Sequence, residues 1–79
     1  MQKVLMYTTH SCFYCKLAKQ YFAQNGIHYE EKYVDEDQVA LEEMMKKSGQ
    51  MGVPVIDVGG KVVVGFDKDE LKKILSIPD

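Results

Sequence analysis

The chain has 79 residues, the size of one small domain, and 46% of them are hydrophobic, which is ordinary for a globular protein and argues against disorder. Its formal net charge of -2 at pH 7 argues against nucleic acid as a partner. No apolar run is long enough to cross a bilayer or to form the core of a signal peptide. We therefore expect a single cytoplasmic domain over residues 1–79 that is monomeric and has no membrane partner.

The first half of the chain predicts a strand, a helix and a second strand. Residues 3–8 are mostly apolar and predict a buried strand, and helical spacing follows over 13–25, with Gly26 as its stop. Residues 28–34 predict the second strand. The helix connects the two strands, so they should be parallel. One helical stripe is expected to face the sheet: Tyr14, Leu17, Ala18, Tyr21 and Phe22.

A second helix is predicted to begin at Asp35. This aspartate can cap the helix, Gln38 completes a capping box, and Val34 with Val39 supplies a hydrophobic staple. Gly49 is expected to end the helix. Its core-facing residues should be Leu41, Met44 and Met45.

The last third of the chain predicts a hairpin and a helix. Residues 53–58 and 61–65 flank Gly59-Gly60, which is typical of a tight antiparallel turn. Asp67 caps the final helix, with Glu70 three residues later. Its buried face should be Leu71, Ile74 and Leu75, with Phe66 as staple. The fold class is therefore α/β, in the order β-α-β-α-β-β-α, with a four-stranded mixed sheet flanked by three helices.

Cys12 and Cys15 stand between the first predicted strand and the first helix. Two thiols at this spacing can close a small disulfide ring, and the free N–H groups of a first helical turn stabilise a thiolate. A cytosolic chain with two cysteines seldom holds a structural disulfide, so a transient, catalytic one is predicted.

The three predicted helix starts differ in one respect. The second and third each begin with an aspartate, whereas the first has Cys12 at the cap position. A carboxylate there would occupy the free N–H groups and repel a thiolate. We therefore expect Cys12 to be the exposed attacking thiol that forms a mixed disulfide with the substrate. Cys15 should be more buried and should then release the reduced product.

Positive charge beside Cys12 favours its thiolate, which makes His10 and Lys16 candidate tuning residues. His10 could also shuttle a proton; an exposed loop histidine with a small electrostatic effect is the simpler interpretation. Cys12, Cys15 and His28 match part of a zinc-finger pattern, but the fourth ligand is missing at the required spacing, so no metal site is predicted.

Phe13 and Tyr14 leave alternatives open. Phe13 either packs back on the sheet or forms part of an apolar docking surface. Tyr14 either brings a hydroxyl near the sulfur or packs its ring.

Pro54 is a second candidate feature of the site. It withholds an N–H at a strand start, which leaves an edge where an outside peptide could pair. Spacing alone gives no reason to expect a cis bond before this proline.

Taken together, the Cys-x-x-Cys helix, Gly52-Val53-Pro54 and Gly65-Phe66-Asp67 resemble a small glutaredoxin-like redoxin of the thioredoxin fold, from Lys3 to Leu75. The resemblance implies a thiol–disulfide oxidoreductase that serves electron transport and cell redox homeostasis, with Cys12 as nucleophile and Cys15 as resolving thiol. It also implies a cis bond between Val53 and Pro54, with the Val53 backbone pairing to the substrate. The γ-glutamyl end of glutathione would be received by Gly65, Phe66 and Asp67, with Tyr14 on the same binding surface.

The chain departs from the usual glutaredoxin pattern near the cysteines. Phe13 replaces the usual proline, Thr9 replaces the usual lysine, and Gln50 and Met51 stand where cations are common. There is no arginine in the chain. Related redoxins that donate electrons to ribonucleotide reductase and are reduced by thioredoxin reductase also lack the proline.

The expected partners are therefore disulfide-containing proteins as substrates, and glutathione or thioredoxin reductase as the electron donor, with no bound cofactor. Two alternatives come from other classes. Two chains could share an iron–sulfur cluster through their Cys12 thiolates and two glutathiones, or the chain could be a regulatory domain that docks a partner through Phe13.

Overall fold

The computed structural model describes residues 3–78, which form three helices and four strands. The elements are β1 (Val4–Thr8), α1 (Phe13–Gln24), β2 (Glu30–Tyr33), α2 (Gln38–Ser48), β3 (Val55–Val58), β4 (Lys61–Val64) and α3 (Lys68–Leu75). Their order confirms the predicted β-α-β-α-β-β-α. No helix in this part of the chain has the length and apolar character that crossing a membrane requires.

The four strands form one mixed sheet in the order β2-β1-β3-β4. β1 runs parallel to β2, with Thr8 opposite Tyr33. β3 runs antiparallel to both β1 and β4, so that Val55 lies opposite Tyr7 on one side and Val64 on the other. The last residues of β1, β2 and β4 therefore meet the first residue of β3 at one end of the sheet. We call this the disulfide end, because Cys12 follows β1 there.

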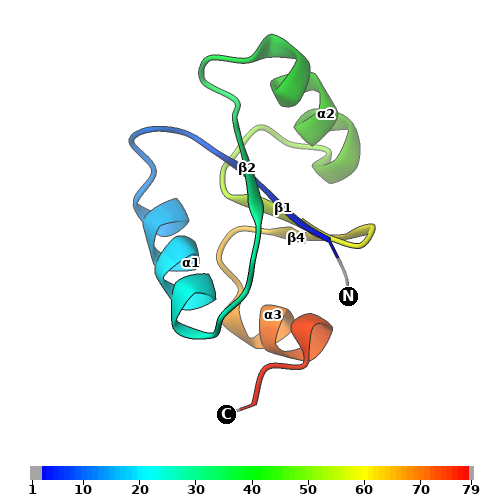
Figure 1. Ribbon diagram of the computed structural model, residues 1–79. Coiled ribbons are helices and arrows are strands. Elements are labelled where there is room, and N and C mark those ends of the chain that lie inside the picture. The colour runs from blue at the N-terminus through cyan, green and yellow to red at the C-terminus, as the bar shows by residue number, and fades with distance from the viewer. Residues whose placement is uncertain (1–2, 79) are drawn as a thin grey trace.

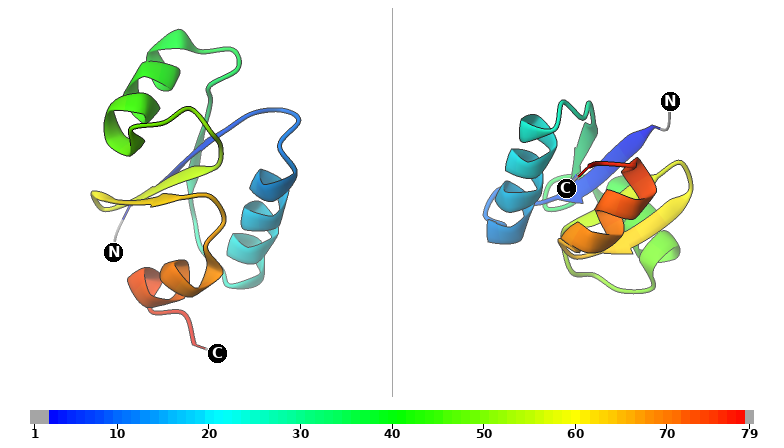
Figure 2. Two further views of the ribbon diagram at one scale, coloured as in Figure 1. Left: turned by 180° about the vertical axis from the view of Figure 1, so that it is seen from behind. Right: turned by 90° about the horizontal axis from the view of Figure 1, so that it is seen from below.

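The helices divide between the two faces of the sheet: α1 and α3 cover one face and α2 covers the other (Figures 1 and 2). Successive residues of β1 point to opposite faces of the sheet, as the two-residue repeat of a strand requires. The core under α1 and α3 contains Val4, Met6, Ala18, Tyr21, Phe22, Ile56, Val58, Val63 and Leu71. The core under α2 contains Tyr7, Val34, Ala40, Met44 and Val55.

The start of α2 differs from the prediction. Asp37, not Asp35, caps this helix, because its Oδ1 accepts the backbone N–H groups of Val39 and Ala40 at 3.0 and 3.2 Å. Asp35 lies in the turn before the cap, where its carboxylate accepts hydrogen bonds from a residue of the β1–α1 loop. The predicted capping box is wrong because Asp35 is not the cap, and the predicted hydrophobic staple between Val34 and Val39 is wrong because Val39 is 64% exposed.

Three smaller expectations are also corrected. β2 begins at Glu30, so His28 lies in the preceding loop instead of in the strand. Met45 of α2 faces outward, while Met44 alone of that pair is fully buried. Tyr14 is 59% exposed and is absent from the buried stripe of α1, where Cys15 joins Ala18, Tyr21 and Phe22.

The predicted turns and the third helix start are confirmed. Gly59 and Gly60 connect β3 to β4 with φ values of 58° and 98°, in the region that glycine adopts without a steric penalty. Gly49 ends α2 in the left-handed conformation. Asp67 caps α3 by accepting the N–H of Glu70 at 3.2 Å.

Candidate redox-active site

Three segments that are distant in sequence meet at the disulfide end of the sheet. The loop from Thr9 to Cys12 leaves β1, and Val53-Pro54 enters β3 directly beside it, because Val55 pairs with Tyr7. The Pro54 carbonyl accepts the backbone N–H of Gly65 at 2.8 Å, which brings the segment after β4 to the same place. The sheet register therefore brings together the Cys-x-x-Cys, Gly-Val-Pro and Gly-Phe-Asp motifs on which the resemblance to glutaredoxins rests.

Cys12 and Cys15 form a disulfide, with their Cα atoms 5.2 Å apart. Cys12 is the N-cap of α1 in an extended conformation, and its Sγ accepts the backbone N–H of Cys15 at 3.1 Å. The first turn of α1 contains no acidic side chain. The amide groups of this helix start therefore face sulfur and no carboxylate, as the sequence predicts, and this arrangement favours a thiolate once the bridge is reduced.

The two cysteines differ in exposure. Cys15 is 1% exposed and packs within the buried face of α1, whereas Cys12 is partly accessible to solvent. An incoming sulfur can therefore reach the bridge at Cys12, while Cys15 is protected. This asymmetry matches the predicted division between an attacking and a resolving thiol.

The peptide bond between Val53 and Pro54 is cis, as the resemblance implies. Pro54 is buried and Val53 is half-buried. Within residues 3–78, the backbone N–H and C=O of Val53 form no hydrogen bond, so both are available to an added strand. The loop before it is held by Gln50, whose side chain donates to the Gly52 carbonyl at 3.0 Å and accepts the Gly52 N–H at 2.6 Å.

The Gly65-Phe66-Asp67 segment lies beside Pro54, between β4 and α3. Gly65 has a φ of +81°, which a side chain would strain, and its N–H is held by Pro54. Phe66 is half-buried and packs edge-to-face on Tyr21, with ring centroids 5.8 Å apart. Asp67 is exposed at the cap of α3. The expected role of this segment in holding glutathione remains a prediction.

Exposed apolar side chains follow Cys12 and precede the cis proline. Phe13 and Tyr14 are 66% and 59% exposed and pack edge-to-face on each other, with centroids 5.5 Å apart. Phe13 therefore does not pack back on the sheet. Met51, two residues before Val53, is 63% exposed. Lys16, a predicted tuning residue, is also exposed.

His10 has partners that the sequence did not predict. Its backbone N–H donates to Asp35 Oδ2 at 3.1 Å, and its ring Nδ1 lies 3.0 Å from the same oxygen. The ring stacks on Tyr33, with centroids 4.2 Å apart. The hydrogen bond to Asp35 raises the pKa of His10, and the hydrogen bonds from His10 lower the pKa of Asp35. The parallel pairing of β1 with β2 was the available signal, since it places residues after Thr8 near those after Tyr33.

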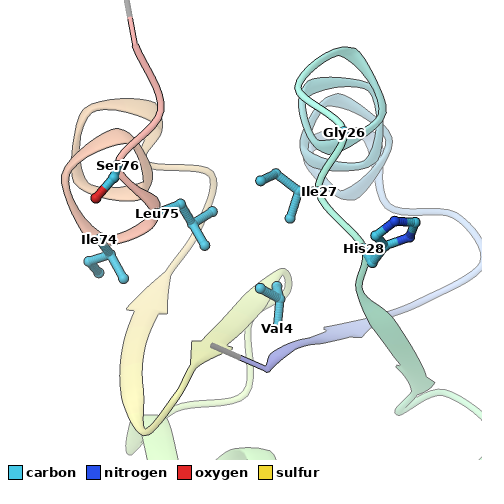
Figure 3. Close-up of a pocket in the computed structure, with 7 residues that line it drawn as sticks. All are labelled: Val4, Gly26, Ile27, His28, Ile74, Leu75 and Ser76. Carbon is cyan, nitrogen blue, oxygen red and sulfur yellow. The ribbon is translucent and has the colours of Figure 1, made fainter. Parts of the chain in front are cut away.

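An open cavity of about 390 Å³ lies at the opposite end of the sheet from the cysteines (Figure 3). It is bounded by the start of β1, the end of α1, the loop before β2 and the end of α3. Its lining residues are Val4, Gly26, Ile27, His28, Ile74, Leu75 and Ser76. The two cysteines lie at the other end of the sheet and do not line this cavity.

Over residues 3–78, no group of three or more His, Cys, Asp or Glu could hold a metal ion.

The family model for glutaredoxin matches residues 4–63, which include both cysteines and the cis proline. The chain belongs to the glutaredoxin family. Among curated relatives, this glutaredoxin is 38% identical over 72 residues to a glutaredoxin-like 8.6 kDa protein in the rubredoxin operon of Clostridium pasteurianum, covering 91% of this chain and 96% of the relative.

Solved structures agree with this assignment. A mutant of the thioredoxin-like protein BC3987 superposes on this glutaredoxin with a TM-score of 0.91 at 28% identity, covering 99% of this chain and 100% of the other. A glutaredoxin from Archaeoglobus fulgidus gives a TM-score of 0.83 at 30% identity, covering 95% and 87%. Family, fold and the Cys12–Cys15 pair together support thiol–disulfide oxidoreductase activity.

Proposed function

We propose that this glutaredoxin reduces disulfides of protein substrates in the cytoplasm through the Cys12–Cys15 dithiol and carries no bound cofactor. The observation that carries the proposal is the pair of unequal sulfurs at a helix start that is capped by sulfur and has no carboxylate. Cys12 is accessible and accepts an amide N–H, while Cys15 is buried within bonding distance of it.

The reaction follows from this arrangement. The Cys12 thiolate attacks one sulfur of the substrate disulfide, and the other substrate sulfur leaves as a thiolate that takes up a proton from solvent. Cys15, as a thiolate, then attacks Cys12 in the mixed disulfide. The second substrate thiolate leaves and is protonated, and the Cys12–Cys15 bridge forms. Two electrons pass to the substrate, and the oxidised state is the one with the intramolecular bridge.

The substrate backbone would pair with Val53 during this exchange. Its N–H and C=O have no partner within residues 3–78, and the register places it beside the loop that carries Cys12. Phe13, Tyr14 and Met51 would contact apolar side chains near the substrate disulfide, since their exposed surface is adjacent.

We propose a flavoprotein thioredoxin reductase as the electron donor. The chain has no arginine to hold the carboxylates of glutathione, and the Gln50 amide is engaged with Ser48 and Gly52. The exposed aromatic surface around Cys12 fits a protein donor better than a charged tripeptide.

A turnover assay with insulin as the disulfide substrate tests both the oxidoreductase activity and the identity of the electron donor. One arm supplies NADPH and thioredoxin reductase, and the other supplies NADPH, glutathione and glutathione reductase. We expect turnover in the first arm and a much lower rate in the second. The reverse ratio would contradict the donor assignment, and no turnover in either arm would contradict the oxidoreductase. Anaerobic purification that yields acid-labile sulfide and a visible absorption band would favour a cluster-binding dimer instead.

A further inference from the structure

The loop that presents Cys12 is tied to the rest of the molecule at one residue. Among Thr9, His10 and Ser11, His10 is the one whose side chain forms a hydrogen bond or ring contact with a residue of another segment in the described structure. Its backbone N–H and its ring both reach the Asp35 carboxylate, and its ring lies flat on Tyr33, with an interplanar angle of 16°. Two contacts from Asp35, just after β2, and one from Tyr33, the last residue of β2, thus hold the residue two positions before the attacking sulfur.

This attachment also sets the charge around Cys12. The segment from Asp35 to Asp37 holds three consecutive carboxylates, and the His10 ring lies 3.0 Å from Asp35 and 3.9 Å from Glu36. The other cation facing this group is Lys19 of α1, whose Nζ lies 5.3 Å from the Tyr33 ring centroid. Lys19 is already paired with Glu31 at 3.3 Å. When His10 is protonated, its imidazolium is therefore the cation that compensates Asp35 within residues 3–78.

His10 and Asp35 lie close to the backbone that carries Cys12. Two residues of extended chain span at most about 7 Å, so the His10 backbone lies within this distance of the Cys12 backbone. The Asp35 carboxylate contacts the His10 backbone N–H and is therefore within about 10 Å of the Cys12 backbone. These separations are comparable to the Debye length at physiological ionic strength, about 8 Å, a range over which charges at a protein surface still interact.

We propose that His10 is a positioning residue of the redox site: clamped by Asp35 and Tyr33, it holds the Cys12 loop in place, and in its charged form it cancels the acidic segment that would otherwise disfavour the Cys12 thiolate. The proposal rests on the proposed role of Cys12 as the attacking thiol. Loss of the His10 proton leaves Asp35 uncompensated and so lowers the reactivity of Cys12. The raised pKa of His10 extends its charged form toward neutral pH.

The test is the pH profile of Cys12 alkylation in reduced protein carrying Cys15→Ser, which leaves one thiol to follow. Iodoacetamide is the probe, and the rate is measured from pH 5 to pH 9 by mass spectrometry. In the His10→Gln variant we expect a rate roughly two- to fivefold lower near pH 6, which is the size expected for one partly screened charge at this distance. At pH values above the folded pKa of His10, where the parent has also lost this charge, the two rates should coincide.

Two further variants separate charge from shape. His10→Lys keeps a positive charge, so it should retain the original rate near pH 6 and exceed it above pH 8. Asp35→Asn removes the partner that favours the imidazolium, so the His10-linked step in the profile should move to lower pH. The matched control is His28→Gln, since His28 is the other histidine of the chain and lies at the opposite end of the sheet (Figure 3). It should change nothing.

Equal rates for His10→Gln and the parent near pH 6 would overturn the inference. An equal slowing at pH 6 and pH 9 would also overturn it, because that result indicates a disturbed loop and no effect of charge. Failure of the proposed function looks different: the parent Cys12 would then react no faster than glutathione at any pH, whatever residue stands at position 10.

Discussion

The starts of α1 and α2 use the same backbone arrangement with different chemistry. Both N-cap residues are extended, and both accept a backbone N–H from the first turn: Asp37 through Oδ1 at 3.0 Å, and Cys12 through Sγ at 3.1 Å. At α2 a permanent carboxylate satisfies the amide groups and stabilises the helix. At α1 the amides meet a sulfur that can gain or lose charge. One capping geometry therefore supports stability at one helix and reactivity at the other.

The two helix starts also differ in what surrounds them. Cys12 is followed by exposed Phe13 and Tyr14 and preceded by His10, which is held by Asp35. Asp37 is followed, two residues later, by Val39, which is equally exposed but belongs to a helix start without a cysteine. The α2 start is consequently an internal control for the α1 start, and Val39→Ser, Asp37→Ala and Asp37→Ser use it in this way.

The largest effect is expected from replacing the α1 cap with an ordinary one. Cys12→Ser should lower disulfide turnover by at least about a thousandfold, because an alcohol forms no disulfide and is not ionised at neutral pH. Serine is a strong helix cap, so the free energy of unfolding should stay within about 1 kcal/mol of the reduced parent. Insulin turnover and urea unfolding under reducing conditions measure the two quantities. Residual turnover in Cys12→Ser would place the nucleophile elsewhere.

The second comparison concerns the exposed apolar residues of the two first turns. Phe13→Ser should lower kcat/KM for a protein disulfide by roughly tenfold, the loss expected when a central apolar contact of an interface is removed. Turnover of a small disulfide such as hydroxyethyl disulfide should change little, because such a substrate does not reach the surface around Phe13. Val39→Ser is the matched control and should leave both rates unchanged. An equal loss on both substrates would show that Phe13 acts on the sulfur and not on docking.

The third comparison removes the carboxylate cap of α2. Asp37→Ala should lower the free energy of unfolding by about 1 kcal/mol and the Tm by about 4–8 °C, because two N–H groups lose their acceptor. Asp37→Ser should restore most of this loss. Because each variant removes one carboxylate of the Asp35–Asp37 segment, the alkylation rate of Cys12 should rise slightly, and by the same amount, in both. Thermal unfolding followed by circular dichroism gives the stability, and a rate that follows the stability loss of Asp37→Ala and recovers in Asp37→Ser would contradict a purely electrostatic link between the two helix starts.

The smallest effect is expected from the pH dependence of the His10–Asp35 pair. Because the pKa of His10 is raised in the folded state, its contribution to stability is complete below its unfolded value of about 6.5 and is lost as the pH rises through the folded pKa. Because the pKa of Asp35 is lowered, its contribution is present above about 4 and is lost as the pH falls. The Tm difference between the parent and His10→Gln should thus be greatest between about pH 4 and 6.5 and should shrink at lower and at higher pH. A difference that is the same inside and outside this range would contradict the ion pair.

Much of the fold could be predicted because its signals are local. The apolar periodicity of the helices, Gly59-Gly60 between two strands and the aspartate cap at Asp67 each depend on neighbours within a few residues. The start of α2 was wrong for a reason that local rules cannot resolve. Two aspartates, Asp35 and Asp37, precede Gln38, and either could cap a helix. The choice was decided by His10, 25 residues away from Asp35, which occupies that carboxylate.

The site was predicted to an unequal degree. The spacing of Cys12 and Cys15 was sufficient to predict the bridge and its two roles, whereas the cis bond at Pro54 came from the resemblance, since spacing gave no reason for it. Hydrophobic pattern could not decide whether Phe13 is buried, because a residue in a first helical turn packs only if another element covers it. In the structure it packs on Tyr14 and remains exposed.

By itself, the sequence determined that two cysteines stand at the start of a helix without an acidic cap, because cysteine spacing and the missing carboxylate are properties of consecutive residues. The tertiary structure alone decided which groups surround those atoms. Parallel pairing of β1 with β2 places His10 against Tyr33 and Asp35, and antiparallel pairing of β1 with β3 places Val53 beside the Cys12 loop. These contacts join segments that are remote along the chain, and their energies depend on distances that only the folded sheet sets.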